Sequence, residues 1–420
     1  MQLDRRAFLA TATAATTSLC APMVVGQARP RVVVIGGGSG GGTAARYVAH
    51  GSEGAIDVIL IEPSRRYYTC YFSNLYMGGF WDFDALGHDY GTIARQGVNV
   101  VHDWATGVDR DARTVTLASG GSVAYDRLVV APGIDFVDGS VPGWDVTQQA
   151  VMPHAYKSGT QAQLLRHQIA TMREGGLYCM VAPPNPYRCP PGPYERVSMV
   201  AHVFSQTNPT AKILIVDPKP NFSKQALFEE GWARHYPGMI EWIGPDFGAD
   251  RVEVRPDAME VDIDGMVEQV DVCNVIPAQK AGHIAELAGL TNDAGWAPVM
   301  PGDMRSRMDD NIFVLGDASQ QGAMPKSGFS ANSQAKVVAN VIRGELTGSR
   351  VFPARYSNTC WSLIGTDDGV KVGASYEPGE EQIESVSSFI SQTGEDADLR
   401  RQTYEESIGW YNGIVSDIFG

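Results

Sequence analysis

Short runs of consecutive apolar residues, separated by turns rich in glycine and proline, recur along the chain. Residues 31–35, 57–61, 177–182 and 213–217 form such runs, and each is long enough for one strand. A continuous apolar run of this length is typical of a strand buried on both faces. Small residues over 43–50 predict a helix between the first two strands. The pattern therefore predicts an α/β fold with two nucleotide-type lobes.

A glycine-rich loop joins the first strand to this helix. Its sequence is Gly-x-Gly-x-x-Gly, with the glycines at Gly36, Gly38 and Gly41. In a dinucleotide site the first glycine allows a tight turn, the second lets the backbone approach a pyrophosphate, and the third brings helix and strand close. Glu62 ends the second strand about 20 residues further on, where an acid accepts hydrogen bonds from an adenosine ribose. These residues predict a dinucleotide site, and the alternative is a glycine-rich turn without a ligand.

Two later segments resemble parts of flavoproteins of the glutathione-reductase type. Residues 125–133 resemble the strand and turn by which those proteins leave their first lobe, and residues 311–318 resemble their returning strand. The resemblance implies that Asp317, in the turn with Gly316, hydrogen-bonds the ribityl chain of FAD. Alone, the second segment could equally be an ordinary buried strand closed by a turn. In register with the glycine loop, it favours FAD over NAD.

A further helix of small residues is predicted to begin after 324–329 and to extend through Ala335. Its positive end can face the pyrimidine edge of a reduced flavin. Lys326 can add positive charge there, and the alternative is a solvated surface lysine.

The second lobe lacks a phosphate-binding loop. After the strand 177–182, the place of a second glycine fingerprint is taken by residues 183–195, which contain six prolines. Proline has no amide hydrogen, so this loop cannot present the row of N–H groups that a pyrophosphate needs. The strand 213–217 still follows. We therefore expect the second lobe to keep its fold without a nucleotide site, and the electron donor to be something other than a nicotinamide.

Composition narrows the range of partners. The 420 residues are 44% hydrophobic and carry a formal net charge of −15. A chain of this length divides into two or three domains. An acidic chain is a poor ligand for nucleic acid, whose phosphates require a basic face, whereas it can dock on a basic protein. We predict no metal site and no spanning segment.

The first 28 residues have the features of a twin-arginine export signal. Arg5 and Arg6 precede Phe8 and Leu9, an Ala/Thr-rich stretch follows, and residues 26–28 form a small-x-Ala cleavage site. We therefore expect a periplasmic protein that folds around its cofactor before export. Five cysteines remain after cleavage, so at least one is unpaired or otherwise modified.

Cys189 lies in the proline-rich loop, and Cys360 lies in what should be a C-terminal interface domain. In the glutathione-reductase type of fold that domain packs against the flavin. A disulfide between these cysteines can therefore lie beside the flavin, or it can be a structural staple of an exported protein.

Several longer motifs together resemble the flavin subunit of flavocytochrome c sulfide dehydrogenase. The likeness spans nearly the whole mature chain, and the cysteine-proline loop is its most specific part. The motifs are at residues 68–71, 187–196, 324–328, 358–360, 410–412 and 419–420.

The resemblance implies roles for three cysteines. Cys70 would bond the 8α-methyl carbon of FAD as a thioether, although an ordinary core cysteine in an aromatic strand is the alternative. Cys189 and Cys360 would form a redox-active disulfide. Cys179 and Cys273 lie on apolar strands and are expected to be inert core thiols.

In the implied mechanism, hydrosulfide attacks the disulfide, which leaves a persulfide on one cysteine and a thiolate on the other. The electrons then pass to the flavin. Glu195, six residues after Cys189, can take or hold a proton, or it can be an exposed solvated glutamate. The chain has no Cys-x-x-Cys-His, so haem is expected only on a separate c-type cytochrome subunit.

We expect a discontinuous FAD-binding domain at 29–145 and 300–345, a second dinucleotide-like domain at 146–299, and a C-terminal interface domain at 346–420. The nearest enzymatic alternative is a sulfide:quinone oxidoreductase, which should end in basic amphipathic helices, whereas this C-terminal region is rich in glutamate. An alternative of another class is a non-turnover partner that resets thiols or persulfides on a sulfur-carrier protein.

Overall fold

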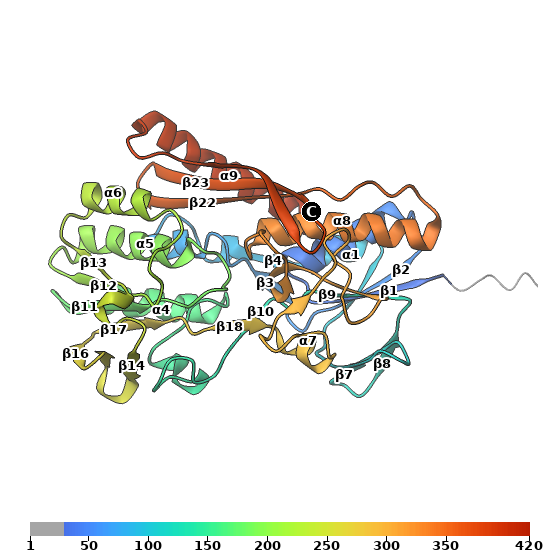
Figure 1. The fold of residues 1–420 in the computed structure, drawn as a ribbon, viewed down its shortest axis with the longest axis horizontal. Coiled ribbons are helices and arrows are strands. Elements are labelled where there is room, and N and C mark those ends of the chain that lie inside the picture. Colours follow the sequence, from blue (N-terminus) through green and yellow to red (C-terminus); the bar gives the residue numbers. More distant parts are fainter. Residues whose placement is uncertain (1–28) are drawn as a thin grey trace, which may run out of the picture.

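The computed structural model describes residues 29–420 and arranges them as two lobes side by side, with a third layer packed on both (Figure 1). The expected export signal, residues 1–28, lies outside the described residues. Each lobe contains its own parallel sheet with helices beside it, so the predicted α/β fold with two Rossmann-type lobes is confirmed.

All five strands of the first sheet run parallel, in the order β20-β9-β1-β2-β5. They are β1 (Arg31–Ile35), β2 (Asp57–Ile61), β5 (Val98–Val101), β9 (Arg127–Val130) and β20 (Ile312–Val314). Helix α1 (Ser39–Gly51) packs against helix α8 (Gly328–Thr347) and lies on this sheet. The sheet thus unites strands from both ends of the chain, because β20 pairs with β9.

Between β2 and β9 the chain forms short elements that complete the first lobe. They are β3 (Arg66–Tyr68), α2 (Ser73–Gly78), β4 (Gly87–Asp89), α3 (Gly91–Arg95), β6 (Ala105–Asp109), β7 (Thr114–Leu117) and β8 (Ser122–Ala124). Strands β3 and β4 pair antiparallel, and β6, β7 and β8 form an antiparallel sheet.

The second lobe is built on a parallel sheet of order β13-β12-β11-β17. Its elements are α4 (Thr160–Thr171), β11 (Leu177–Val181), α5 (Gly192–Thr207), β12 (Lys212–Val216), α6 (Gln225–His235), β13 (Ile240–Ile243) and β17 (Val272–Val275), with an antiparallel sheet of β14 (Val252–Arg255), β15 (Glu260–Ile263) and β16 (Met266–Gln269). Cys179 and Cys273 are directly opposed on β11 and β17 and are fully buried, as expected for core thiols.

Two short antiparallel strands lie where the chain passes between the lobes (Figure 1). Strand β10 (Ile134–Phe136) precedes the second lobe and pairs with β18 (Gln279–Ala281), which follows it. The chain then forms α7 (His283–Leu287), β19 (Ala297–Pro298) and, after β20, β21 (Ser319–Gln320).

The C-terminal residues form the third layer. It consists of an antiparallel sheet, β22 (Tyr356–Gly365), β23 (Asp368–Pro378) and β24 (Ile383–Ile390), followed by α9 (Ala397–Phe419). Strand β22 contacts α5 and α6 of the second lobe as well as α8 of the first. This strand therefore carries C-terminal side chains to the junction of the lobes. Within residues 29–420, no helix combines the length and the apolar character that a bilayer crossing requires.

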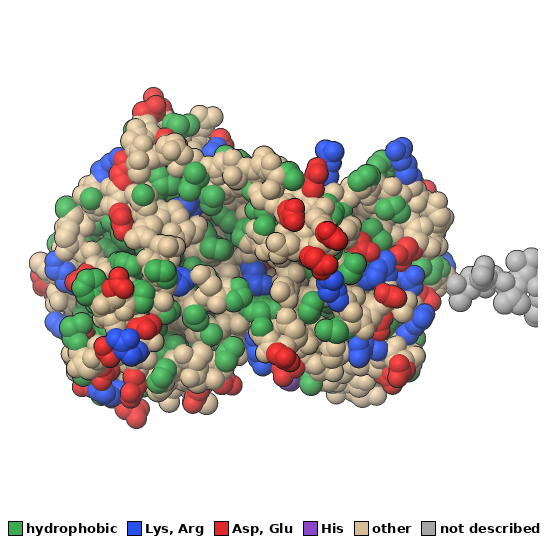
Figure 2. Space-filling view, in the orientation of Figure 1, with side chains coloured by type: hydrophobic (Ala, Val, Ile, Leu, Met, Phe, Trp, Pro, Cys, Tyr) green, Lys and Arg blue, Asp and Glu red, His purple; other side chains and the backbone are tan. Residues whose placement is uncertain are grey.

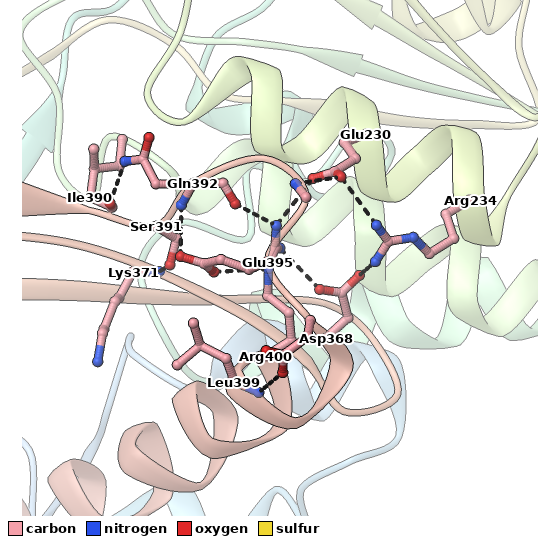
Figure 3. A network of polar contacts seen from close by, with 12 residues as sticks. Glu230, Arg234, Asp368, Lys371, Ile390, Ser391, Gln392, Glu395, Leu399 and Arg400 are labelled. Atoms are coloured by element: carbon pink, nitrogen blue, oxygen red, sulfur yellow. Dashed lines mark hydrogen bonds and ion pairs between the residues drawn. The ribbon is translucent and has the colours of Figure 1, made fainter.

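A buried network of ion pairs fastens the third layer to the second lobe (Figure 3). The Arg400 side chain on α9 is 2% exposed and lies 3.1 Å from Glu230 of α6, 3.1 Å from Asp368 of β23 and 3.0 Å from Glu395. His235 of α6 lies 2.7 Å from the same Asp368. One buried guanidinium thus links three segments.

Two helices are longer than expected. Helix α1 begins at Ser39, before the predicted residue 43, and takes glycines into its first turn; α8 runs to Thr347, well beyond Ala335. A Cβ atom on Gly40 would lie 2.2 Å from Leu315 Cδ1, so glycine at this position lets the first turn of the helix pack closely against Leu315.

Candidate functional site

The glycine loop after β1 has the conformation that its spacing predicts. Gly36 has φ +96°, in the region that favours glycine, and a Cβ there would lie 2.4 Å from the Ala131 carbonyl oxygen. A Cβ on Gly41 would lie 1.8 Å from the Gly36 carbonyl oxygen. Both positions exclude any larger residue, because the helix start and the strand end approach each other so closely.

A cavity opens at this loop. Gly38 precedes α1 and lines the cavity, so the N-terminus of that helix is directed towards it. Glu62, at the end of β2, also lines it and accepts hydrogen bonds from the Gly37 and Ser64 amides, each at 2.8 Å. A helix N-terminus and an adjacent carboxylate are the groups that hold a pyrophosphate and a ribose.

Asp317 lines the same cavity at the end of β20, and the turn at Gly316 has φ +72°. Asp317 is 9% exposed, and its Oδ1 atom has no hydrogen-bond partner among the described residues. A buried oxygen without a donor fits a ligand that supplies one, and a ribityl hydroxyl would be such a donor. Loop, ribose acid and ribityl acid all open into one cavity, so the described residues fit an extended FAD.

Cys70 follows β3 and lines this cavity as well as a second one beside it. Burial raises the pKa of the Cys70 thiol, while the nearby Arg188 guanidinium opposes that rise. Arg188 also lines both cavities and lies 3.5 Å from Asp317. Cys70 is therefore placed at the boundary between the cofactor cradle and the second cavity.

The second cavity brings together Cys189, Cys360 and Glu195. Cys189 lies in the proline-rich loop with φ +57°, and its amide donates to the Lys326 carbonyl at 2.7 Å. Cys360 lies on β22, and its Sγ accepts from Asn358 Nδ2 at 3.3 Å. Both sulfurs are unbonded thiols in this structure. Their pairing as a disulfide stays a prediction, as does its redox role.

Glu195 is buried in the first turn of α5, so the alternative of a solvated surface glutamate is wrong. Its side chain is 9% exposed, Oε2 accepts from Asn74 Nδ2 at 2.8 Å, and Oε1 accepts from the Leu363 amide at 2.9 Å. Burial raises the pKa of Glu195, although these two donors oppose the rise. A carboxyl group with a raised pKa beside two cysteines can exchange a proton with sulfide.

Lys326 is buried beside the Asp317 turn, and its role in adding charge near the flavin stays a prediction. It is 7% exposed, so it is not a solvated surface lysine, yet it lines neither cavity. Its ammonium donates to the Asp317 and Ser319 carbonyl oxygens and lies 3.7 Å above the Trp296 ring. These contacts hold the turn that contains Asp317.

The proline-rich loop uses its few amides internally. The Arg188 amide donates to Gln279 Oε1, and the Gly192 amide donates to the Cys189 carbonyl. Helix α5 then begins with Pro191 as its N-cap and Pro193 in its first turn. The end of this helix that faces the junction therefore offers no row of free N–H groups, in agreement with the predicted loss of a nucleotide site.

Two buried cations near the cysteines were not predicted from the sequence. Arg188 is adjacent to Cys189, so its position in the loop was the available signal. Lys224 is 6% exposed, and its ammonium donates to the Cys360 carbonyl at 3.1 Å and to Ser362 Oγ at 2.8 Å. It follows β12 in an unremarkable polar segment, and no motif marks it.

Family models match three separate parts of the chain. Residues 162–277 match the central domain of the sulfide dehydrogenase [flavocytochrome c] flavoprotein chain, and residues 353–419 match the flavin-binding domain of flavocytochrome c sulphide dehydrogenase. Residues 30–170 match the pyridine nucleotide-disulphide oxidoreductase family.

Curated relatives include both kinds of sulfide-oxidising flavoprotein. The mitochondrial sulfide:quinone oxidoreductase of Dictyostelium discoideum is 21% identical over 322 residues, which are 75% of this chain and 71% of the relative. The mouse enzyme of that name is 22% identical, over 69% of this chain and 65% of the relative. The sulfide dehydrogenase [flavocytochrome c] flavoprotein chain of Chlorobaculum thiosulfatiphilum is 48% identical over 44 residues, which are 10% of this chain and 90% of that sequence.

Solved structures show the same fold. The sulfide:quinone oxidoreductase of Aquifex aeolicus superposes with a TM-score of 0.69 at 18% identity. The superposition covers 93% of this chain and 92% of the Aquifex chain. A ferredoxin reductase of Rhodopseudomonas palustris has a TM-score of 0.63 at 18% identity, with coverage of 84% and 90%. The chain therefore belongs to the sulfide-oxidising flavoproteins that share the pyridine nucleotide-disulphide oxidoreductase fold.

Proposed function

We propose that this chain is the flavoprotein subunit of a flavocytochrome c type of sulfide dehydrogenase. It oxidises sulfide, or a protein-bound persulfide, to sulfur and passes the electrons singly to a c-type cytochrome subunit. The observation that carries the proposal is the shared cavity of Cys189 and Cys360, which adjoins the FAD cradle at Cys70. Cys189 comes from the second lobe and Cys360 from the third layer, so the packing of these two parts brings the cysteines into one cavity.

The chemistry begins with Cys189 and Cys360 joined as a disulfide. Hydrosulfide attacks one sulfur, which forms a cysteine persulfide and releases the other cysteine as a thiolate. Loss of two electrons and one proton from this pair frees sulfur and closes the disulfide again. FAD supplies an acceptor for the electron pair that can hand electrons on one at a time. Glu195 is placed to hold the proton.

Matches to both domain models of the flavocytochrome c flavoprotein, and to the Chlorobaculum chain, support the cytochrome as acceptor. The C-terminal helix supports it too, because α9 directs Tyr411, Ile414 and Ile418 into the protein core. Its only basic pair is Arg400 and Arg401, of which Arg400 is buried in ion pairs. This helix therefore lacks the basic amphipathic character of a membrane-surface anchor.

A sulfide:quinone oxidoreductase is the second candidate. The longer similarities, to the Dictyostelium and mouse enzymes and to the Aquifex structure, favour it. The two candidates share the sulfide half-reaction and differ in the electron acceptor.

Two further features belong to the same proposal. Residues 1–28 direct export by the twin-arginine route to the periplasm, and Cys70 bonds FAD covalently. Cys70 alone among the five described cysteines lines both the cofactor cavity and the cysteine cavity.

The sulfide half-reaction is tested by replacing each cysteine with serine. Cys189→Ser and Cys360→Ser should each abolish flavin bleaching by sulfide under anaerobic conditions, while the flavin spectrum persists. Cys273→Ala is the matched control, because it removes a buried thiol that lies outside both cavities. Wild-type bleaching by either serine variant would show that the cysteines are only structural.

A further inference from the structure

Lys224 occupies a position that is unfavourable for a lysine in three ways. Its side chain is buried, its backbone has φ +64°, and it caps the N-terminus of α6, where the helix dipole is positive. Burial of an ammonium, left-handed backbone and an adjacent positive dipole each disfavour this residue. Strained, charged positions of this kind concentrate at functional sites.

No carboxylate lies within ion-pair distance of the Lys224 ammonium in the described part of the chain, and the Glu195 carboxylate acts on it from further away. The two hydrogen-bond acceptors of Lys224, the Cys360 carbonyl and Ser362 Oγ, are neutral. Lys219, five residues earlier and equally buried, is different, because its ammonium lies 2.6 Å from Asp217. Buried charges are normally paired, so Lys224 would stabilise an anion that forms beside it.

The groups that face Lys224 are those of the cysteine cavity. They are Glu195 from α5, Cys189 from the loop before it and Cys360 from β22. The positive charge of Lys224 lowers the pKa of both thiols against the effect of burial. At Cys360 the amide of Asn358 adds a direct donor to the sulfur.

We propose that Lys224 is the fixed counter-cation for the sulfur anion that forms at Cys360 when hydrosulfide opens the disulfide. The inference rests on the proposed function and adds a residue to it. In the step HS⁻ + Cys–S–S–Cys → Cys–S–SH + Cys–S⁻, the persulfide forms on Cys189 and the negative charge moves from hydrosulfide to Cys360. Lys224 and Asn358 stabilise the leaving thiolate, which makes Cys360 the better leaving group. Lys224 acts through the charge on another residue, so it is a positioning residue.

The test measures the acidity of Cys360 itself. A Cys189→Ser background leaves Cys360 as a lone thiol, and its alkylation by iodoacetamide is followed against pH by peptide mass spectrometry in the flavin-loaded protein. Lys224→Gln keeps a hydrogen-bond donor and removes the charge, whereas Lys224→Arg keeps the charge. Alkylation of Cys360 at pH 7 should slow about tenfold or more in Lys224→Gln, because loss of the charge should raise the pKa of Cys360 by about one unit or more. In Lys224→Arg the rate should stay near that of the Cys189→Ser protein with Lys224 intact.

Lys219→Met is the matched control, since it removes a buried lysine whose charge is already neutralised by Asp217. It should leave the alkylation profile of Cys360 unchanged. If Lys224→Gln does not fold, Lys224→Met replaces it, with the same expected shift. A folded charge-removing variant with an unaltered profile would refute the proposal. The result does not depend on sulfide turnover, so loss of the proposed function would leave this measurement interpretable.

Discussion

The Cys70 position determines whether the flavin can be attached covalently. It lies at the boundary of the two cavities, and Arg188 offsets part of the cost of ionising its buried thiol. The thiolate of a cysteine is the nucleophile that reacts with an electrophilic carbon to give a thioether.

We therefore expect the yellow colour of the flavin to remain in the protein pellet after acid precipitation. Cys70→Ala should release all of the flavin into the supernatant while the protein stays folded, and Cys273→Ala should retain it. Free flavin from the wild-type protein would show that the attachment is non-covalent.

Glu195 gives a pH dependence whose sign follows from its burial. Burial raises the pKa of Glu195, so its carboxylate form is lost at a higher pH than for a solvated glutamate. If the carboxylate takes the proton, flavin reduction at a fixed hydrosulfide concentration should rise as the pH increases through this raised pKa.

Glu195→Gln should slow that reduction about 100-fold and remove this limb of the pH profile, as expected for a lost general base. Stopped-flow absorbance measures both effects. A glutamine variant with the same pH limb would assign the limb to another group.

At single positions, the sequence predicted backbone requirements better than side-chain directions. Gly36 and Gly41 could be assigned because the spacing of a strand, a turn and a helix determines where a Cβ cannot fit. Lys326 is buried against the ring of Trp296, and Glu195 is buried against Asn74 and Leu363, which come from other parts of the chain. Lys224 had no local signal at all.

Among the elements, the loop between β11 and α5 makes the sharpest prediction about the electron donor. The amides of Arg188, Cys189 and Gly192 donate within the protein, and proline occupies six other positions of residues 183–195, so the loop presents no row of N–H groups to a pyrophosphate. Anaerobic NADH or NADPH should leave the flavin oxidised, whereas sulfide should bleach it quickly. Rapid bleaching by either nucleotide at micromolar concentration would contradict this interpretation of the loop.

Helix α9 depends on Arg400 for its attachment (Figure 3). Removing one partner from a buried ion-pair network leaves the other charges uncompensated, which costs about 3–5 kcal/mol. Arg400→Met should lower the free energy of unfolding by that amount. Arg401→Met is the matched control, because Arg401 is the next residue on α9 and its side chain is 50% exposed. This substitution should change the free energy of unfolding by less than about 0.5 kcal/mol.

The same network predicts a pH effect. Burial opposes ionisation of Asp368, but His235, Arg400 and Arg234 together lower its pKa. A carboxylate with a lowered pKa contributes stability above its unfolded pKa and loses it as the pH falls through the folded value. Chemical denaturation should therefore show the difference between wild type and Arg400→Met narrowing below about pH 4. A constant difference across that range would exclude Asp368 as its source.

The sequence predicted the buried strands well, because a continuous apolar run has few alternatives. β1 and β2 match their predicted bounds, and β11 and β12 lie within a residue of theirs. Helix lengths were less well predicted, since α1 extends back over glycines to Ser39 and α8 continues to a left-handed cap at Gly348. The three strands of the third layer carry no comparable apolar runs, because most of β24 is exposed.

On the scale of the whole molecule, the site exists only where three layers meet. Glycine loop and Asp317 come from the first lobe, Cys189 and Glu195 from the second, and Cys360 from the third. A motif resemblance could name these residues, but their common cavities follow from packing. The net charge of the whole chain is −15, although acidic and basic side chains are interspersed on the face that Figure 2 shows.

The electron acceptor is the most direct test of the proposed function. The sulfide-reduced protein is mixed with a c-type cytochrome and, separately, with a soluble quinone analogue, and both chromophores are followed in a stopped-flow instrument. We expect rapid reduction of the haem, slowed by added salt if the cytochrome is basic, and little reduction of the quinone. Rapid quinone reduction beside negligible haem reduction would contradict the assignment and make the chain a sulfide:quinone oxidoreductase.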